Sequence, residues 1–401
     1  IPFAIDSSAA PRVEETAALP AATPEGMHVL LAEDNELNIE IAVFVLENAG
    51  VTVTKAVNGQ DALDQFAASA PGTFDAIIMD VMMPVMDGYQ ATRAIRQLAS
   101  PGRGGHRPAM EAAKVAFSCR EEAAALFHVP TPEQVVFTAS ATHGLNLAIG
   151  TLVRPGARVA LSGYEHNAVT RPLHALRAQL LVARAPLFQP EAMAAAFRAQ
   201  LDQGAEAAVC THVSNVFGYI LPMEEIARLC RERGVPLIID ASQSAGVLPL
   251  DFQTLGADFI AMPGHKGLYG PQGTGLLLCG RMPEPLLQGG TGSESVRQEM
   301  PDFLPDRAEP GTHNIPGIAG LLEGLRFVRR LGPETIARRE HHLLRQLGEG
   351  LRELPGVQTF YAPGGVNQTG VLSFRLSGRD CEEASVFGTL ALGWLFGRKL
   401  L

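Results

Sequence analysis

The chain has 401 residues, of which 46% are apolar and 18% are charged, a composition typical of globular domains rather than of disordered chains. This length is enough for two or three domains, each with its own core. The formal net charge of −10 leaves no excess of basic residues to neutralise phosphates, so neither a nucleic acid nor an anionic membrane is an expected partner.

The five cysteines stand singly in the sequence, and none forms a CxxC pair. An odd number of isolated cysteines does not predict a disulfide framework and indicates a reducing compartment, so we expect a cytoplasmic protein. The sequence also predicts neither a signal peptide nor a transmembrane helix.

Residues 1–26 are rich in Ala, Pro, Ser and Glu without periodicity, which predicts a linker. In residues 27–100, short apolar runs alternate with segments of helical spacing. The predicted strands are "HVLLAEDN", "VTVTKAV" and "FDAIIMD". This alternation predicts a parallel sheet of the flavodoxin-like type.

After the break "PGRGGHRPA", the alternation resumes over residues 101–330, which predicts a large α/β domain with a mostly parallel sheet and helices on both faces. Residues 317–353 predict one long amphipathic helix. Residues 331–401, with a late strand in "TGVLSFRLSG", predict a smaller and truncated C-terminal domain. The strands of the large domain are expected in "QVVFTA", "RVALSG", "AAVCTHVS", "PLIIDAS", "DFIAMP" and "TGLLLC".

Three acids lie at strand ends in the first domain: Glu33 and Asp34 after the first strand, and Asp80 after the third. Carboxyl ends of neighbouring parallel strands converge in one crevice, and clustered carboxylates are typical of a Mg²⁺ site. A carboxylate beside Mg²⁺ is able to accept a phosphoryl group. The alternative is that each acid is simply solvated.

The motifs "LLAEDN" and "IIMDVMMPVMDG" together resemble the receiver domain of bacterial response regulators over residues 27–100. The resemblance implies Asp80 as the phosphoacceptor of a phosphorelay, with a histidine kinase as partner. It implies Mg²⁺ ligands from Glu33, Asp34, Asp80 and the Met82 carbonyl. A receiver has two further strands in the order 2-1-3-4-5, so this domain is expected to be partial, with its third strand at an edge.

In the second domain, Lys266 lies in the Gly-rich stretch "AMPGHKGLYGPQGTG", whose glycines are expected to let the chain turn tightly. A lone lysine among glycines is consistent with a solvated loop residue or with a catalytic lysine, whose common partner is pyridoxal 5′-phosphate (PLP). Such a site needs an acid at the pyridine nitrogen and a polar group at the phenolic oxygen. Asp240 and Gln243 after "PLIIDAS" are the candidates, although Asp240 alone is about as consistent with a helix N-cap.

Three further segments follow other strands of the same predicted sheet. Thr142 and Ala141 begin a helix whose N–H groups suit a phosphate, His166 could stack on a ring, and Asn215 ends another strand. Taken singly, a histidine such as His166 is more often an ordinary surface or core residue, and Asn215 is consistent with a turn. Together they predict one site at the carboxyl edge of the sheet.

The segments "SATHGLN", "YEHNAVTRPL", "SNVFGYILP", "IIDASQSAG" and "PGHKGLYGPQGTG" together resemble the class V aminotransferase family, and most of all its cysteine desulfurase branch. The resemblance implies a type I PLP-dependent fold, a homodimer with shared sites, and cysteine or selenocysteine as substrate. Lys266 is implied as the Schiff-base lysine and, with His166, as catalytic. The implied cofactor-binding residues are Lys266, Asp240, Gln243, His166, Thr142, Ala141, Asn215, His265 and, through "EPGTHN", Thr312 toward the partner's phosphate.

The sequence departs from the family pattern in three places, one of which is the N-terminal segment that helps close the substrate site and is expected to be missing before "PGRGGHR". Pro263 replaces a serine that contacts the phosphate, and no cysteine lies in the loop that carries the nucleophilic thiol, since Cys381 comes too early in the pattern. A thiolate must accept the sulfur, so we expect an impaired cysteine desulfurase-like protein. Two alternatives stay open: a phosphoacceptor receiver fused to an output domain, and a chimeric chain without activity.

Overall fold

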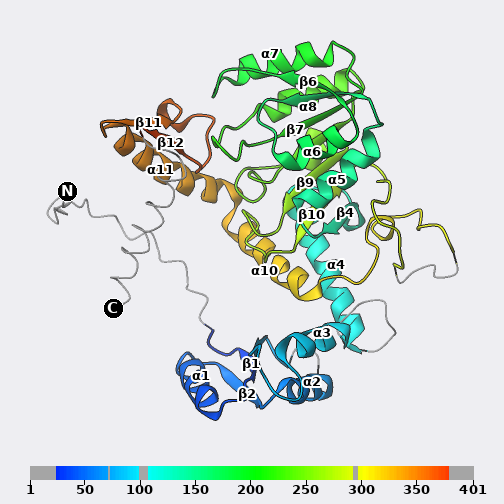
Figure 1. Ribbon diagram of the computed structural model, residues 1–401, viewed down its shortest axis with the longest axis vertical. Helices are drawn as coiled ribbons and strands as arrows, with labels where there is room; N and C mark the ends of the chain where they lie inside the picture. Colours follow the sequence, from blue (N-terminus) through cyan, green and yellow to red (C-terminus); the bar gives the residue numbers. More distant parts are fainter. Residues whose placement is uncertain (1–23, 71–72, 99–106, 292–296, 379–401) are drawn as a thin grey trace. The chain divides into compact units, whose positions relative to one another are not determined.

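The computed structural model describes residues 24–70, 73–98, 107–291 and 297–378 (Figure 1). The chain divides into two compact units, residues 1–99 and residues 100–401. None of the helices in the described ranges combines the length and hydropathy that a bilayer crossing requires.

In the described part of the first unit, three strands alternate with three helices. In chain order these are β1 His28–Ala32, α1 Glu36–Asn48, β2 Thr52–Ala56, α2 Gly59–Ala68, β3 Ala76–Met79 and α3 Gly88–Leu98. The sheet is parallel in the order β2–β1–β3. The predicted alternation is therefore confirmed, and among the described residues β3 is paired on one side only.

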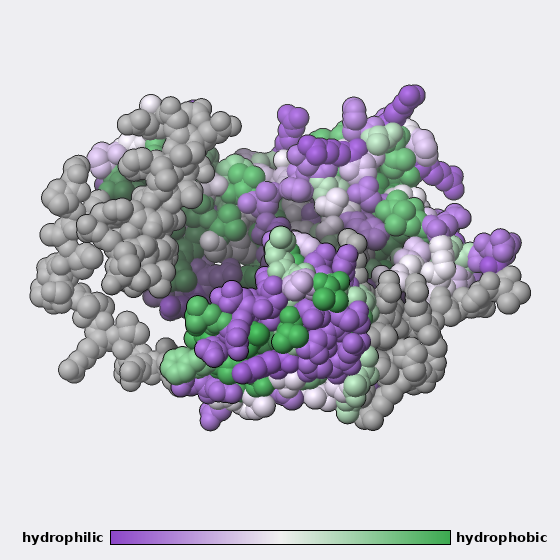
Figure 2. Space-filling model, turned by 60° about the horizontal axis from the view of Figure 1, so that its bottom comes forward, coloured by the Kyte–Doolittle hydropathy of each residue, from purple (hydrophilic) through white to green (hydrophobic). Residues whose placement is uncertain are grey.

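The two faces of this small sheet pack against different helices. Leu30 and Ala62 belong to the cluster on the α2 face, whereas Leu31 packs with Ile39 and Val43 of α1. The side chains of a strand point alternately to its two faces, so neighbouring β1 residues reach opposite layers. Figure 2 shows that apolar residues also lie among hydrophilic ones on the surface, and in this unit Phe44 is an exposed example.

The second unit contains the remaining elements. They are α4 Arg107–Phe127, β4 Val135–Thr138, α5 Ala141–Leu152, β5 Arg158–Ser162, α6 Asn167–Ala175, β6 Gln179–Ala183, α7 Pro190–Leu201, β7 Ala207–Thr211, α8 Met223–Glu232, β8 Leu237–Asp240, α9 Phe252–Leu255, β9 Phe259–Pro263, β10 Gly275–Cys279, α10 Ile315–Leu331, α11 Pro333–Arg352, β11 Val357–Phe360 and β12 Ser373–Leu376.

The large sheet has the strand order β4–β10–β9–β8–β7–β5–β6, and β10 alone runs antiparallel to its neighbours. Apolar residues of α5 and α6 pack on one face of the sheet, while those of α4, α7, α8 and α10 pack on the other (Figure 1). This arrangement confirms the predicted mostly parallel sheet with helices on both faces. β11 and β12 form a separate antiparallel pair.

The expectation of one long helix over residues 317–353 is wrong, because the structure has two helices there, α10 and α11. Gly332 separates them with φ of 78°, a left-handed conformation that a helix does not adopt. Pro333 then begins α11, and a proline at the first helical position needs no N–H partner.

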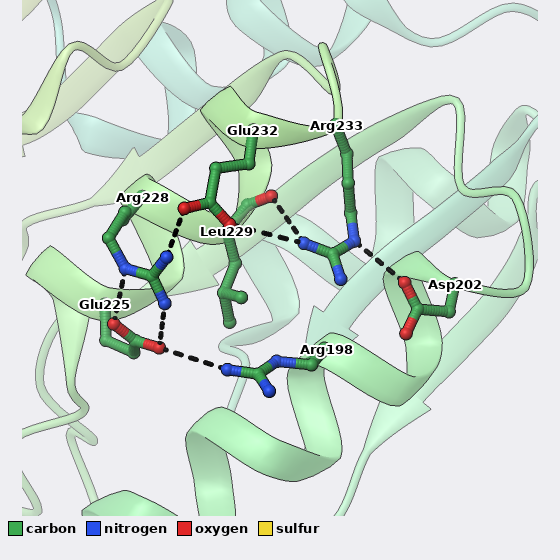
Figure 3. A network of polar contacts seen from close by, with 7 residues as sticks. All are labelled: Arg198, Asp202, Glu225, Arg228, Leu229, Glu232 and Arg233. Atoms are coloured by element: carbon green, nitrogen blue, oxygen red, sulfur yellow. Dashed lines mark hydrogen bonds and ion pairs between the residues drawn. The ribbon is translucent and has the colours of Figure 1, made fainter.

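A network of exposed ion pairs joins α7 to α8 on the surface (Figure 3). Arg228 lies between Glu225, at 2.8 Å from Nε to Oε2, and Glu232 on the same helix. Glu225 also meets Arg198 of α7, and Arg233 meets Asp202 at 2.8 Å. These charges are solvent-exposed, so the network orients the two helices but contributes little stability.

A second ion pair is buried. The Arg120 guanidinium of α4 donates to both carboxylate oxygens of Glu309, at 2.8 and 2.6 Å. Glu309 Oε1 also accepts from the backbone N–H of Phe137 at 2.5 Å, and the Arg120 side chain lies 4.1 Å over the Phe137 ring. The bidentate pair thereby ties α4 and β4 to the segment that begins at Glu309.

Candidate active site

One cavity of about 160 Å³ collects segments from the carboxyl ends of five strands: β4, β5, β7, β8 and β9. The structure brings together there all the residues predicted to bind PLP except Thr312. The predicted residues that line the cavity are Ala141, Thr142, His166, Asn215, Asp240, Gln243, His265 and Lys266, with Pro263 beside them.

Asp240 is the most enclosed charged residue of this cavity, with 2% of its surface exposed. Burial raises the pKa of its carboxyl group, while hydrogen bonds from Ser242 and the nearby Lys266 and His166 act in the opposite direction. The Ser242 N–H donates to Oδ1 at 2.9 Å. A buried carboxylate of this kind is suited to a positively charged partner.

The glycines around Lys266 serve close packing more than turning. A Cβ added to Gly267 would lie 2.4 Å from the Ala245 carbonyl oxygen, and one added to Gly246 would lie 2.0 Å from the Gly267 carbonyl oxygen. Within "AMPGHKGLYGPQGTG", only Tyr269 and Gly273 have positive φ. The expectation of tight turns therefore holds at Gly273, and Gly267 is needed because two backbones meet there.

The N-terminus of α5 opens onto the same cavity. The Ser140 hydroxyl caps the helix by accepting from the His143 N–H at 3.2 Å. The first N–H groups of a helix lack intrahelical acceptors, so those of Ala141 and Thr142 can donate to an anion. Both residues line the cavity.

His166 caps α6, where its Nδ1 accepts from the Ala168 N–H at 3.1 Å. In a neutral imidazole this leaves the proton on Nε2. The ring is exposed toward the cavity, which also contains the amine of Lys266 and the carboxylate of Asp240. An amine, a buried carboxylate, an imidazole and helix N–H donors in one cavity fit the functional groups of PLP.

Thr312 lies apart from these residues. It lines a second cavity of about 240 Å³, together with His143, Thr274 and His313. The segment that carries Thr312 begins at Glu309, whose buried pair with Arg120 fixes it to α4.

Sequence reasoning missed part of the surroundings of Lys266. Lys266 and Gln243 also line a third cavity of about 340 Å³, which Glu340 of α11 and Thr369 close from the other side. Glu340 accepts from the Gly370 N–H at 3.4 Å, and burial raises the pKa of its carboxyl group. No local pattern marks Glu340, since it lies on a helix far along the chain.

The four cysteines in the described ranges are all buried. Burial raises the pKa of the Cys119 and Cys230 thiols to about 12 and shifts those of Cys210 and Cys279 in the same direction. Thiols with such pKa values are not thiolates at neutral pH. Cys381 lies outside the described residues.

In the first unit the three predicted acids do come together. One carboxylate oxygen each from Glu33, Asp34 and Asp80 lies within 4.8 Å of the others. The Glu33 carboxylate also accepts from Asn38 Nδ2 at 3.0 Å. Met82, the fourth predicted ligand through its carbonyl, follows two residues after Asp80 with an 80% exposed side chain.

The family model described as aminotransferase class-V matches residues 83–388, more than half of the chain. The chain belongs to the class V aminotransferase family. The model of the response regulator receiver domain matches residues 29–103 of this class V aminotransferase. Both families predicted from the sequence motifs are therefore confirmed.

Named relatives and solved structures agree with this assignment. A probable cysteine desulfurase of Xylella fastidiosa is 34% identical, with 72% of this chain and 71% of that one covered. The apo structure of cysteine desulfurase from Thermococcus onnurineus superposes with a TM-score of 0.65 at 29% identity, covering 72% and 74% of the two chains. A C-DES variant with glycine covalently linked to its PLP cofactor gives a TM-score of 0.59 at 26% identity, covering 68% and 76%. The predicted fold of PLP-dependent cysteine desulfurases is thus confirmed for the second unit.

Proposed function

We propose that this class V aminotransferase binds PLP in the Lys266 cavity and acts there on an amino acid, cysteine or selenocysteine. The observation that carries the proposal is one cavity that joins Lys266, the buried Asp240 and the N-terminus of α5. The family and the named relatives support the same reaction class.

In this proposal each residue acts on a different part of the cofactor. Lys266 would hold it covalently, Asp240 would face its ring nitrogen, and Gln243 its phenolic oxygen. The N–H groups of Ala141 and Thr142, with His265, would bind the phosphate, and His166 would stack on the ring, with Asn215 beside it. When bound, PLP supplies an electron sink for the substrate. Lys266 would also act as the base that moves the substrate α-proton.

The second half of the reaction moves sulfur. The carbon–sulfur bond of cysteine breaks, the sulfur forms a bond to an acceptor thiolate, and the carbon takes a proton to give alanine. We propose that transfer to a thiol of this chain is impaired, because the four cysteines of the described ranges are buried and have raised pKa values, and Cys381 comes too early in the family pattern. An added thiol would then have to accept the sulfur.

Absorbance tests the cofactor. The purified chain, mixed with PLP and desalted, is expected to keep a visible band that Lys266→Ala abolishes because the covalent link is lost. Arg281→Ala is a control, since Arg281 pairs with Asp258 on the surface. Absence of the band in the wild-type chain would refute PLP binding.

Alanine and sulfide production tests the reaction. We expect alanine from L-cysteine only when a thiol such as dithiothreitol is added as acceptor. Robust turnover without added thiol would show that a cysteine of this chain does accept sulfur. No alanine under either condition, in a chain that binds PLP, would favour a chain without activity.

A homodimer is part of the proposal. Thr312 lines a cavity other than that of Lys266, which supports a role for it in the site of a second copy. Light scattering is expected to give twice the mass of one chain, and a monomeric mass would contradict the shared site.

The acidic cluster supports a second function for the first unit. We propose that Glu33, Asp34, Asp80 and the Met82 carbonyl bind Mg²⁺ and that Asp80 accepts a phosphoryl group from a histidine kinase. Incubation with labelled acetyl phosphate is expected to label Asp80 when Mg²⁺ is present. No label is expected after the Mg²⁺ is chelated, or in the Asp80→Asn variant. Labelling that persists in Asp80→Asn would exclude this assignment.

A further inference from the structure

Glu165, directly before His166, turns its carboxyl group into the protein beneath the site. Its Oε1 accepts from the Ser162 hydroxyl at 2.5 Å and from the Thr211 backbone N–H at 2.9 Å. Thr211 is the residue of β7 that pairs with Asp240 of β8. One side chain therefore links the end of β5, the His166 turn and the strand beside Asp240.

This contact has a structural reason. β5 ends at Ser162, and its neighbour β7 continues to Thr211. The Thr211 N–H would lose its acceptor where β5 leaves the sheet, and a buried N–H without a partner costs free energy. The Glu165 carboxyl takes the place of the missing strand at that point.

The other carboxyl oxygen, Oε2, is buried and has no hydrogen-bond partner among the described residues. An ionised carboxylate in this position would be unfavourable. Burial, with the charge of Asp240 as a smaller cause, raises the pKa of Glu165 to about 8 against the hydrogen bonds from Ser162 and Thr211. The buried, unpartnered Oε2 and the raised pKa both favour the protonated form of Glu165.

Two buried carboxyl groups, those of Glu165 and Asp240, thus lie close together in a region that favours only one negative charge. Asp240 is the better place for that charge, because Lys266, His166 and the Ser242 N–H all act on it. The Cys210 thiol of β7 also lies beside Glu165, and burial raises its pKa, so that it adds no charge.

We propose that Glu165 is a positioning residue that anchors the His166 turn to β7 and leaves Asp240 as the ionised carboxylate of the site. This inference rests on the proposed PLP function, and it concerns a residue that does not itself line the Lys266 cavity. It makes two predictions that can be tested separately: the hydrogen bonds of Glu165 hold the His166 turn in place, and the Glu165 carboxyl group is protonated.

The geometric property is tested by cofactor affinity. The cofactor is first removed from the purified protein, and PLP is then titrated back while visible absorbance is measured. The titration is done for Glu165→Gln, Glu165→Ala and the surface control Glu121→Gln on α4. Glu165→Gln keeps an acceptor for Thr211 and needs no charge, so it is expected to bind PLP within about twofold of wild type. Glu165→Ala removes both hydrogen bonds and is expected to weaken binding about tenfold or more. Wild-type affinity in Glu165→Ala would overturn the anchoring role.

The proton is tested without cofactor, by the pH profile of thermal unfolding of the apoprotein. Between the unfolded pKa near 4.5 and the folded pKa near 8, the folded chain keeps a proton that the unfolded chain has lost. Stability from this group is therefore full below pH 4.5 and falls as the pH rises toward 8. Glu165→Gln is expected to lose this fall, whereas Glu121→Gln keeps it.

The two arms separate this inference from the function on which it rests. If wild-type protein binds no PLP, the proposed function fails and the positioning role falls with it, while the pH profile still reports the proton on Glu165. If PLP binds and Glu165→Gln retains the wild-type pH profile, Glu165 is not the protonated group and the assignment of charge to Asp240 is wrong.

Discussion

The absence of a Cβ atom at Gly267 allows the close packing that positions the proposed catalytic lysine, Lys266. The Gly267 Cα lies so close to the segment after β8 that an added Cβ would be 2.4 Å from the Ala245 carbonyl oxygen. Since both partners are backbone, neither can rotate away. The Asp240 and Lys266 segments are thereby held in direct contact.

We therefore expect Gly267→Ala to displace the Lys266 loop, lower the free energy of unfolding by about 1–3 kcal/mol and weaken PLP binding. Urea unfolding and PLP titration measure the two effects. Gly150→Ala is the matched control, because nothing lies within 4 Å of its added Cβ on α5 and alanine favours helix. Unchanged PLP affinity in Gly267→Ala would contradict the close-packing argument.

His212, directly after β7, gives the fold a pH dependence of the opposite sign to that of Glu165. Burial lowers the pKa of its imidazole to about 4, and its Nδ1 has no partner in the described part of the chain. As the pH falls below 6.5, His212 becomes protonated in the unfolded chain but stays neutral in the folded chain. The contribution of His212 to the free energy of unfolding is therefore lost as the pH falls from 6.5 toward 4.

Within that window, the free energy of unfolding is expected to fall by up to about 1.4 kcal/mol per pH unit from this group. Urea unfolding of wild type and His212→Gln at pH 7 and pH 5 isolates the effect, since only the wild-type chain should show it. Equal pH dependence in both chains would assign the acid sensitivity elsewhere.

At the scale of elements, the two ion-pair systems differ in burial and therefore in energetic weight. The Arg120–Glu309 pair is buried between α4 and the segment after residue 308, whereas the α7–α8 network in Figure 3 is exposed. Removing one partner of a buried pair leaves an uncompensated charge, but an exposed partner is simply solvated.

Arg120→Met is expected to cost about 3–5 kcal/mol of stability, because it leaves the buried Glu309 carboxylate without its guanidinium partner. Arg228→Met, the matched exposed change, should leave the melting temperature nearly unchanged. Thermal unfolding of the two variants compares them directly. A similar loss in both would mean that the α7–α8 network has structural weight that its exposure does not predict.

At the scale of the whole molecule, the two compact units have separate cores and separate proposed ligands. The boundaries drawn from the sequence, at 26, 100 and 330, stay predictions. A ligand that binds only a folded unit stabilises that unit. We therefore expect PLP to shift one thermal transition and Mg²⁺ another.

Calorimetry of the full chain with each ligand alone measures this directly. Asp80→Asn should abolish the Mg²⁺ shift and leave the PLP shift intact, and Lys266→Ala should reduce only the PLP shift. One transition that both ligands move together would show that the two units unfold as one.

Much of the fold followed from local pattern. Apolar runs ending in polar residues located β4, β5, β7, β8 and β9, because buried parallel strands must be apolar and must end where side chains meet solvent or ligand. β6 was missed, since it is an edge strand with two of its five residues exposed and lacks that signal. The break at Gly332 was missed because amphipathic spacing continues across it.

The sequence by itself determined the family, the α/β alternation and the residue types of the candidate site, since each is written in short segments at strand ends. Only the tertiary structure showed that β10 is antiparallel to its neighbours, that Gly267 is needed for close packing and that the Glu165 carboxyl group contacts Thr211 beside Asp240. Each depends on a contact between segments that are separated in the chain, and the Glu165–Thr211 contact joins residues 46 positions apart. Local propensity cannot encode such contacts, because only the folded sheet brings those strand ends together.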